Sequence, residues 1–367
     1  MKTGKKILLG AGIVLGVILL AAAGLIGWLT VREFRPAAVE DVGIDRTGGP
    51  QTVSLSPGDS LTVLSQNTGY AGLGAASDFF MDGGKDVAPT WDQEQKNLAG
   101  LDNQLFIDRR ADVYFLQEVD TNSSRSHGVD QSAYYWNHLH LLLGDETGTY
   151  SSSHALNYSC DFVPFPWPPI GKVHSGLQTL SRFSVSGAQR VALPCPFSWP
   201  VSAANLKRCL LVSRVPLDGS DRELVLVNLH LEAYDDGEGK AAQTKALMDF
   251  LTAEYEKGKY VIAGGDFNQT FPGALEVFPI QDENLWTPGV LEDEMLPEGW
   301  RFACDLSTPS CRLLNHPYDP NPDGNQFYII DGFILSPNVA LDSVETLDCQ
   351  FAYTDHNPVF LQVTLAG

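Results

Sequence analysis

The chain has 367 residues, enough for one large domain or two ordinary ones, and 44% of them are hydrophobic. It carries 24 basic and 45 acidic residues, which gives a net charge of −21. This balance argues against non-specific binding to nucleic acid, because such binding needs a basic surface that displaces counterions from phosphates. It is compatible with a metal enzyme, because cations neutralise a carboxylate-rich site.

The first 35 residues predict a membrane anchor. Three lysines lie within "MKTGKK", and residues 7–30 then contain no charged residue, a run long enough to cross a bilayer as a helix. Lysines before the helix favour a cytoplasmic N-terminus and an extracellular catalytic domain. The alternative is a cleaved signal peptide, since the small residues Ala21, Ala22 and Ala23 suit cleavage. We favour the single-pass anchor because "GLIGWLT" continues the apolar run beyond them.

Composition divides the rest of the chain in two. Residues 36–60 mix Pro, Gly, Ser and Asp and predict a linker, whereas residues 61–367 predict one domain without internal repeats. Residues 1–35 hold five of the 24 basic residues and one of the 45 acidic ones, so the remainder carries 19 and 44 and a net charge of −25. Because anionic lipids repel such a body weakly, we expect the helix to supply the attachment to the membrane. No obligate protein partner is indicated.

The stretch "VIAGGDFNQT", residues 261–270, ends an apolar run with two polar residues. The run predicts a buried strand, and Asp266 and Asn268 follow where a fold can hold side chains over a cleft. The Gly264–Gly265 pair before them allows the backbone to approach a neighbour closely. The alternative is a strand followed by an ordinary Asx turn.

The same arrangement of an apolar run with a polar residue at or near its end recurs along the domain. Strands are predicted for "LTVLSQN", "ADVYFLQEVD", "GLQTLSRF", "ELVLVNLHLEA", "FYIIDGFIL" and "DHNPVFLQVTL". The clearest helix covers residues 241–258, where apolar residues recur at helical spacing and Gly258 suits the end. The polar residues placed in this way are Asn67, Glu118, His230, Asp266, Asn268, Asp331, Asp355 and His356.

These residue types suit a hard cation and a phosphate group. Carboxylate and amide oxygens bind magnesium, manganese or calcium. Imidazoles transfer protons or form hydrogen bonds with phosphoryl oxygens. Each residue alone is compatible with a solvated strand end, but the full ordered set predicts a phosphate-ester site.

The residues lie in the segments "LSQN", "LQEV", "VNLHL", "GGDFN", "IIDGFIL" and "TDHNPV", between Leu64 and Val359. In this order the segments resemble the endonuclease/exonuclease/phosphatase (DNase I-like) superfamily, which includes pancreatic DNase, abasic-site endonucleases, neutral sphingomyelinases and inositol-polyphosphate 5-phosphatases. The resemblance implies an α/β fold, a four-layered sandwich of two packed mixed β-sheets with helices outside, preceded in this chain by the N-terminal transmembrane helix.

The resemblance also implies a metal site. Glu118 would be the principal ligand of Mg²⁺ (or Mn²⁺ or Ca²⁺), with help from Asn67 and Asp355. Such a cation would offset the charge that builds on the phosphoryl oxygens and the leaving group.

The other matching residues would act on the substrate. Asp266 and Asn268 would position the attacking water and the phosphate. His230 and His356 would contact the phosphoryl group. Asp331 would orient the ring of His356, as a carboxylate commonly does for an imidazole.

We therefore expect a metal-dependent hydrolase of a phosphate mono- or diester. A lipid headgroup or small phosphate ester is favoured as substrate, because the charge disfavours nucleic acid and the residue two past Glu118 is the acidic Asp120. The alternatives are an extracellular nuclease and a non-catalytic binding relative, although no ligand position is missing.

Loop residues suggest contacts for the substrate. Lys85 and Arg125 are candidates for phosphate contacts, although Arg125 also suits an ordinary surface position. The stretches "FVPFPWPPIG" and "PCPFSWP" interleave proline with aromatic residues, which suits a membrane interface. The alternative, which we favour slightly, is that they line the edge of the core or a lid.

All six cysteines lie in the domain that we expect to be exported, where disulfides persist. Cys304 and Cys311 flank a short loop, and Cys195 and Cys209 are spaced to close a hairpin. Buried free thiols are the alternative. No CxxC pair is present, which argues against a zinc site.

Overall fold

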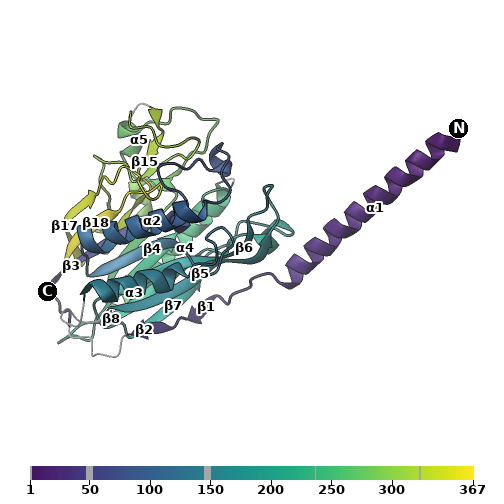
Figure 1. Cartoon of the computed structure of the whole chain (residues 1–367). Helices are drawn as coiled ribbons and strands as arrows, with labels where there is room; N and C mark the ends of the chain where they lie inside the picture. The colour runs from purple at the N-terminus through teal and green to yellow at the C-terminus, as the bar shows by residue number, and fades with distance from the viewer. Residues whose placement is uncertain (1, 47–52, 144–149, 236, 322–323) are drawn as a thin grey trace.

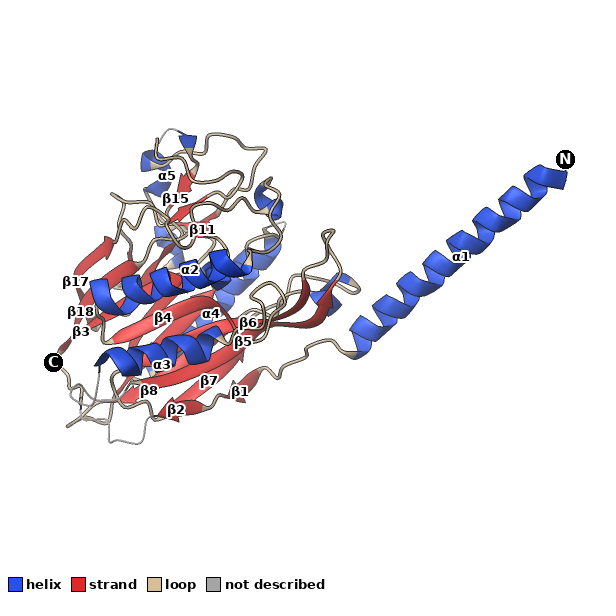
Figure 2. Cartoon of the chain, in the orientation of Figure 1, coloured by secondary structure: helices blue, strands red, loops and turns tan. Residues whose placement is uncertain are grey.

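In the computed structural model, two mixed β-sheets face each other and helices cover their outer faces (Figures 1 and 2). This arrangement confirms the four-layered α/β sandwich. Helices α2 (Trp91–Asn103) and α3 (Gln131–Leu143) pack on one sheet, and α4 (Glu238–Glu256) packs on the other. The structure describes residues 2–46, 53–143, 150–235, 237–321 and 324–367.

Each main sheet has seven strands among the described residues. In spatial order, the first sheet consists of β1 (Val39–Asp41), β7 (Gly187–Ala192), β8 (Cys209–Pro216), β9 (Glu223–His230), β10 (Tyr260–Asp266), β16 (Asp331–Leu335) and β13 (Arg301–Ala303). In the same order, the second consists of β17 (Val339–Thr346), β18 (Val359–Leu365), β3 (Ser60–Asn67), β4 (Val113–Asp120), β6 (Gly171–Ser181), β5 (Ser151–Val163) and β2 (Ile44–Arg46).

The central strands read as unbroken apolar runs because both of their faces are buried. Successive side chains of a strand point to opposite faces. In β9, Leu224 and Leu226 therefore pack between the two sheets, whereas Val225 and Val227 pack under α4. The same alternation divides β3, β4 and β10 between the central layer and the helix layers.

Helix α4 begins three residues before the predicted start and ends two residues before the predicted end. Leu247 and Leu251 face the sheet and are fully buried. Gly258, two residues past the helix, has a φ of +79°, the left-handed conformation in which many helices end.

The predicted strand "FYIIDGFIL" is two strands. Phe327–Tyr328 (β15) pairs with Cys311–Arg312 (β14) in a small separate sheet, and β16 then joins the first main sheet. A second small sheet pairs β11 (Gln269–Thr270) with β12 (Gly289–Val290). One further short helix is α5 (Ala274–Val277).

Helix α1 (Lys2–Val31) extends away from the body (Figure 1). Its segment Lys6–Val31 is long and apolar enough to cross a membrane. A signal sequence passes the same test. The segment predicted as a linker, residues 36–60, contributes β1, which pairs with β7, and β2, which pairs with β5. The start of this segment is thus bound to the edges of both main sheets. Residues 47–52 lie outside the described part of the chain.

Candidate active site

Three neighbouring strands of the first sheet bring predicted residues to one edge. Strands β9 and β10 are parallel, so His230 and Asp266 lie side by side at their carboxyl ends. Strand β16 runs antiparallel and begins there, with Asp331 paired to Asp266. The glycine pair makes this edge compact, since a Cβ on Gly265 would lie 2.0 Å from the carbonyl oxygen of Leu229.

The second sheet supplies Asn67 and Glu118 from the parallel strands β3 and β4. The ladder between β4 and β6 is interrupted by a bulge after Leu116, and Glu118 has a φ of +55°. Bulges re-aim side chains, and this one turns Glu118 out of the strand's alternation. The amide Nδ2 of Asn67 donates to Oε1 of Glu118 at 3.3 Å and to Oδ2 of Asp266 at 3.0 Å, which ties the two sheets together.

Asp355 and His356 lie on the loop between β17 and β18. Nδ1 of His356 lies 2.8 Å from Oδ2 of Asp331, and Nε2 lies 3.8 Å from Oδ2 of Asp266. The hydroxyl of Ser310 donates to the same Asp331 oxygen at 2.8 Å and accepts the N–H of Asp331 at 3.0 Å. The sequence did not single out Ser310, because a serine in "TPSC" carries no motif.

The buried carboxylates repel one another. Burial raises the pKa of Asp266 to about 7, and the nearby charge of Asp331 adds to the rise. Burial also raises the pKa of Asp355 to about 6, with a further contribution from the charge of Glu118. The protein does not fully neutralise the repulsion among these carboxylates. A bound cation would neutralise it, so the site is chemically suited to one.

The two histidines have opposite tendencies. Burial lowers the pKa of His230 well below its usual value, and the positive charge of Arg208 acts in the same direction. Burial also disfavours charge on His356, yet the carboxylate of Asp331 outweighs it and the pKa of His356 is well above its usual value. Burial therefore favours the neutral form of His230, whereas Asp331 favours the cationic form of His356.

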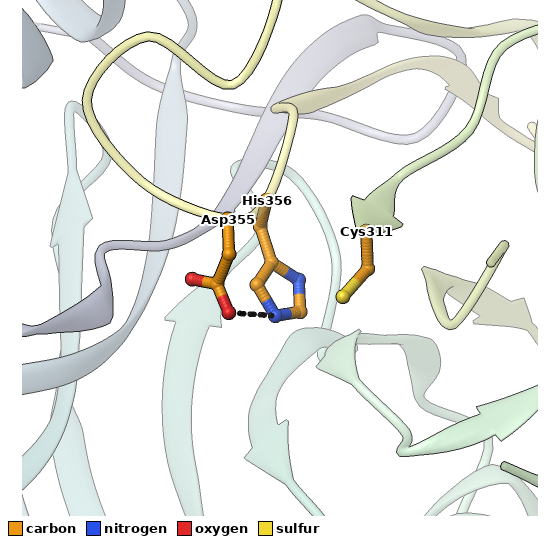
Figure 3. A group of neighbouring side chains, drawn as sticks. All are labelled: Cys311, Asp355 and His356. Carbon is orange, nitrogen blue, oxygen red and sulfur yellow. Dashed lines mark ion pairs between the residues drawn. The ribbon is translucent and has the colours of Figure 1, made fainter. Parts of the chain in front are cut away.

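Figure 3 shows His356 between Asp355 and Cys311. Nε2 of His356 lies 4.0 Å from Oδ2 of Asp355. Cys311, Asp355 and His356 form one cluster of candidate metal ligands. Burial raises the pKa of the Cys311 thiol to about 12, so it keeps its proton and is a poor ligand for a hard cation. Asp355 is therefore the ligand of this cluster that suits magnesium.

The other close cluster of candidate ligands consists of Asp266, Asp331 and His356. Among the described residues, neither cluster includes Glu118, whose Oε1 lies 4.0 Å from Nε2 of His230. Glu118 nevertheless opens into the same cavity as Asp355.

A cavity of about 630 Å³ contains the site. Asp331 lies behind His356, where it holds the ring, while the other predicted residues are exposed to the cavity. Those residues are Asn67, Glu118, His230, Asp266, Asn268, Asp355 and His356.

Arg125 is not an ordinary surface arginine, because it lines the cavity and is paired with a buried aspartate. Its Nε and Nη2 bind the two carboxylate oxygens of Asp120 at 3.1 and 3.0 Å, and its guanidinium lies 3.7 Å from the centre of the Tyr70 ring. Asp120 is fully buried and its charge is paired, so its acidity does not repel a substrate as the sequence suggested. Lys85 is exposed and lies outside the cavity wall.

The sequence did not predict Arg208, which lines the cavity and is only 4% exposed. Its Nε lies 3.6 Å from Oε2 of Glu232. Within the described residues, Nε and Nη1 of Arg208 have no hydrogen-bond partner. The only signal in the sequence was that Arg208 directly precedes β8, the strand that pairs with β9, at whose end His230 lies.

The six cysteines all lie in the described part of the chain and all are free thiols, so the predicted disulfides are not formed. The register between β7 and β8 pairs Cys209 with Ala192 rather than with Cys195. Cys304 packs on the α4 side of the first sheet, whereas Cys311 belongs to a separate cluster beside the small sheet.

Comparison with known proteins agrees with this fold. The profile of the endonuclease/exonuclease/phosphatase family matches residues 96–356. No curated protein shows a significant match. Among solved structures, a family protein from Beutenbergia cavernae DSM 12333 has 19% identity and a TM-score of 0.55, covering 84% of this chain and 72% of its own.

Two further bacterial structures of the same family description are similar. The protein from Leptotrichia buccalis C-1013-b has 11% identity and a TM-score of 0.54, covering 83% of this chain and 100% of its own. The protein from Bacteroides vulgatus has 13% identity and a TM-score of 0.52, covering 84% and 99%. At these identities the structures show the fold. The family match shows that this chain belongs to the endonuclease/exonuclease/phosphatase family, whose members are generally hydrolases of phosphate esters and typically use divalent metals.

Proposed function

We propose that the protein is a membrane-anchored, divalent-metal-dependent hydrolase of a phosphate mono- or diester, and that it acts on a lipid headgroup or small phosphate ester rather than on nucleic acid. The convergence of carboxylates, amides and two unlike histidines in one cavity carries this proposal. Both close clusters of candidate metal ligands in the described residues include His356 of this cavity.

Asp266 is the proposed general base. Its Oδ1 is held by the backbone N–H of Asn268 at 2.8 Å, while Oδ2 lies 3.3 Å from Nε2 of His230. A carboxylate with a pKa of about 7 is suited to accept a proton from water near neutral pH. Water deprotonated there attacks phosphorus, and the bond to the leaving oxygen breaks.

The phosphoryl oxygens are bound by the surrounding N–H groups. His356, held cationic by Asp331, donates a charge-assisted hydrogen bond, and His230 donates from Nε2 as the neutral ring. Asn268 is positioned by its Nδ2, which donates to the carbonyl oxygen of Leu231 at 2.9 Å. Arg208, which also lines the cavity, is a further candidate partner of the phosphate.

Glu118, Asp355 and Asn67 would hold the cation, most simply Mg²⁺. Their donor atoms are hard oxygens, and burial, together with the nearby charge of Glu118, raises the pKa of Asp355, so a cation would stabilise its ionised form. When bound, the cation supplies positive charge that stabilises the phosphoryl oxygens and the leaving group.

Helix α1 is the proposed anchor, with residues 1–35 forming the basic tip and span and the domain from residue 61 lying outside the cell. The lysines at the N-terminus support this orientation. The net charge of −25 beyond the anchor supports a substrate other than nucleic acid.

The full chain in detergent micelles should be assayed against DNA, RNA, phospholipids, sphingomyelin and inositol phosphates, with Mg²⁺ and with a chelator. We expect hydrolysis of at least one lipid or small phosphate ester, abolished by the chelator. A preference for DNA would instead identify a nuclease, and binding without hydrolysis across the panel would identify a non-catalytic relative.

A further inference from the structure

The end of helix α1 forms part of the active-site cavity. Ile26 and Leu29 line the same cavity as the catalytic residues, and Leu29 is buried against Cys160, Val173 and Ala203 of the body. The segment of the chain that is suited to span a bilayer therefore continues directly into one wall of the site.

Polar contacts fix this end of the helix to the body. Nε1 of Trp199 donates to the hydroxyl of Thr30 at 3.0 Å. Just beyond the helix, Arg32 pairs with Asp161 at 2.6 Å, and Glu33 pairs with Lys207 at 3.0 Å. Lys207 and Glu33 are both mostly buried, so the second ion pair is shielded from solvent.

Exposed apolar side chains, which we call the rim, lie in the lining of the cavity or close to lining residues in the sequence. We define the rim as Met81, Phe165, Trp167, Trp199 and Val201. Phe165, Trp167 and Trp199 are 71%, 89% and 63% exposed. Met81, Phe165 and Val201 also line the cavity, so the rim is continuous with its inner wall.

The rim comes from three loops that are far apart in sequence. They are the loop before α2, the tip of the hairpin between β5 and β6, and the loop before β8. Figure 1 shows that α1 leaves the body beside the hairpin that joins β5 and β6. Apolar side chains in such numbers on a water-facing mouth are costly, whereas tryptophan and phenylalanine beside a membrane span suit the bilayer interface.

Resting on the function proposed above, we infer that the substrate is a membrane phospholipid that enters from the bilayer, with its phosphate on the polar floor and its hydrocarbon chain on the wall made by α1 and the rim. The cavity has both parts that such a molecule needs. Its floor carries Glu118, Asp266 and His356, and its mouth carries apolar side chains. A water-soluble phosphate ester would use the floor alone.

Two esters with the same reacting bond isolate the role of the chain: methyl p-nitrophenyl phosphate and hexadecyl p-nitrophenyl phosphate. The full-length protein is assayed with each in the same mixed micelles with Mg²⁺. Because each buried methylene contributes favourably to binding, we expect kcat/KM for the hexadecyl ester to exceed that for the methyl ester by more than about tenfold.

Rim variants then locate the binding surface. Phe165→Ser and Val201→Ser should each reduce the ratio of the two kcat/KM values by at least about threefold, because each removes apolar surface. Leu141→Ser is the control, since Leu141 is also a highly exposed apolar residue, at 77%, but lies on α3. Its ratio should equal that of the wild type.

The outcomes separate the two proposals. If neither ester is hydrolysed, this inference is wrong, and the substrate panel described above then decides the phosphoesterase assignment separately. If both esters are hydrolysed with equal kcat/KM, or if the rim variants leave the ratio unchanged, the lipid inference is wrong while the phosphoesterase assignment stands.

Discussion

Asp266→Asn should lower kcat for phosphate-ester hydrolysis by about 10²–10³-fold, the usual effect of removing one group that stabilises a transition state. Asparagine keeps the size of the side chain, and its oxygen can still accept the N–H of Asn268. It cannot take a proton from water, and it presents no negative charge to His230 and His356, which lie 3.3 and 3.8 Å from Oδ2 of Asp266. Steady-state kinetics with the best substrate of the panel measure the effect.

The stability of the same variant distinguishes catalysis from folding. Because burial and the charge of Asp331 already disfavour ionised Asp266, losing that charge offsets the loss of the hydrogen bond from Nδ2 of Asn67, and Tm should change little. Asp249→Asn makes the same chemical change at an exposed position on α4 and should retain full activity. Turnover by Asp266→Asn at the rate of the Asp249→Asn control would contradict the proposed base.

Glu118→Gln should weaken Mg²⁺ binding by more than the ~10–100-fold that follows loss of an outer-shell partner of a metal ligand. Glutamine keeps the amide–oxygen contact with Nδ2 of Asn67 but removes the charge that a divalent cation requires. Titration calorimetry of the full chain with Mg²⁺ measures the affinity without relying on activity.

A second measurement guards against an indirect effect. Saturating Mg²⁺ should raise the Tm of the wild type, because a ligand that binds only the folded state stabilises it. The shift should be smaller in Glu118→Gln and persist in Glu345→Gln, which alters a half-exposed glutamate side chain on β17. Equal Mg²⁺ affinity in the two variants would place the metal elsewhere.

The sequence was sufficient for the layers of the fold because the physical signal is strong there. Unbroken apolar runs such as those of β9 and β10 require burial on both faces, which only sheets covered on both sides provide. The break between β15 and β16 could not be seen in the sequence. Ile329 and Ile330 are buried like strand residues, but they pair neither with β14 nor with β10.

The site was predictable where motif residues end strands, and less so where tertiary contacts decide. His230 and Asp266 follow from the carboxyl ends of adjacent strands. Arg208 and Ser310 could not be predicted in this way, because their place in the site depends on tertiary contacts. Arg208 lies beside Glu232, and Ser310 donates to Asp331. The pairing of Arg125 with Asp120 likewise turned an apparent surface charge into a buried ion pair.

The contribution of α1 to the cavity could not be predicted from the sequence either. Composition identified an apolar helix, but it offered no reason to place Leu29 near residues more than one hundred positions away in the chain. Packing against Val173 and Ala203 makes that connection.

Anomalous diffraction from crystals of the full chain soaked in Mn²⁺ tests the central claim most directly. We expect a manganese peak in the cavity, within bonding distance of carboxylate oxygens of Glu118 and Asp355. A single strong peak elsewhere on the protein, with both carboxylates free of metal, would contradict it.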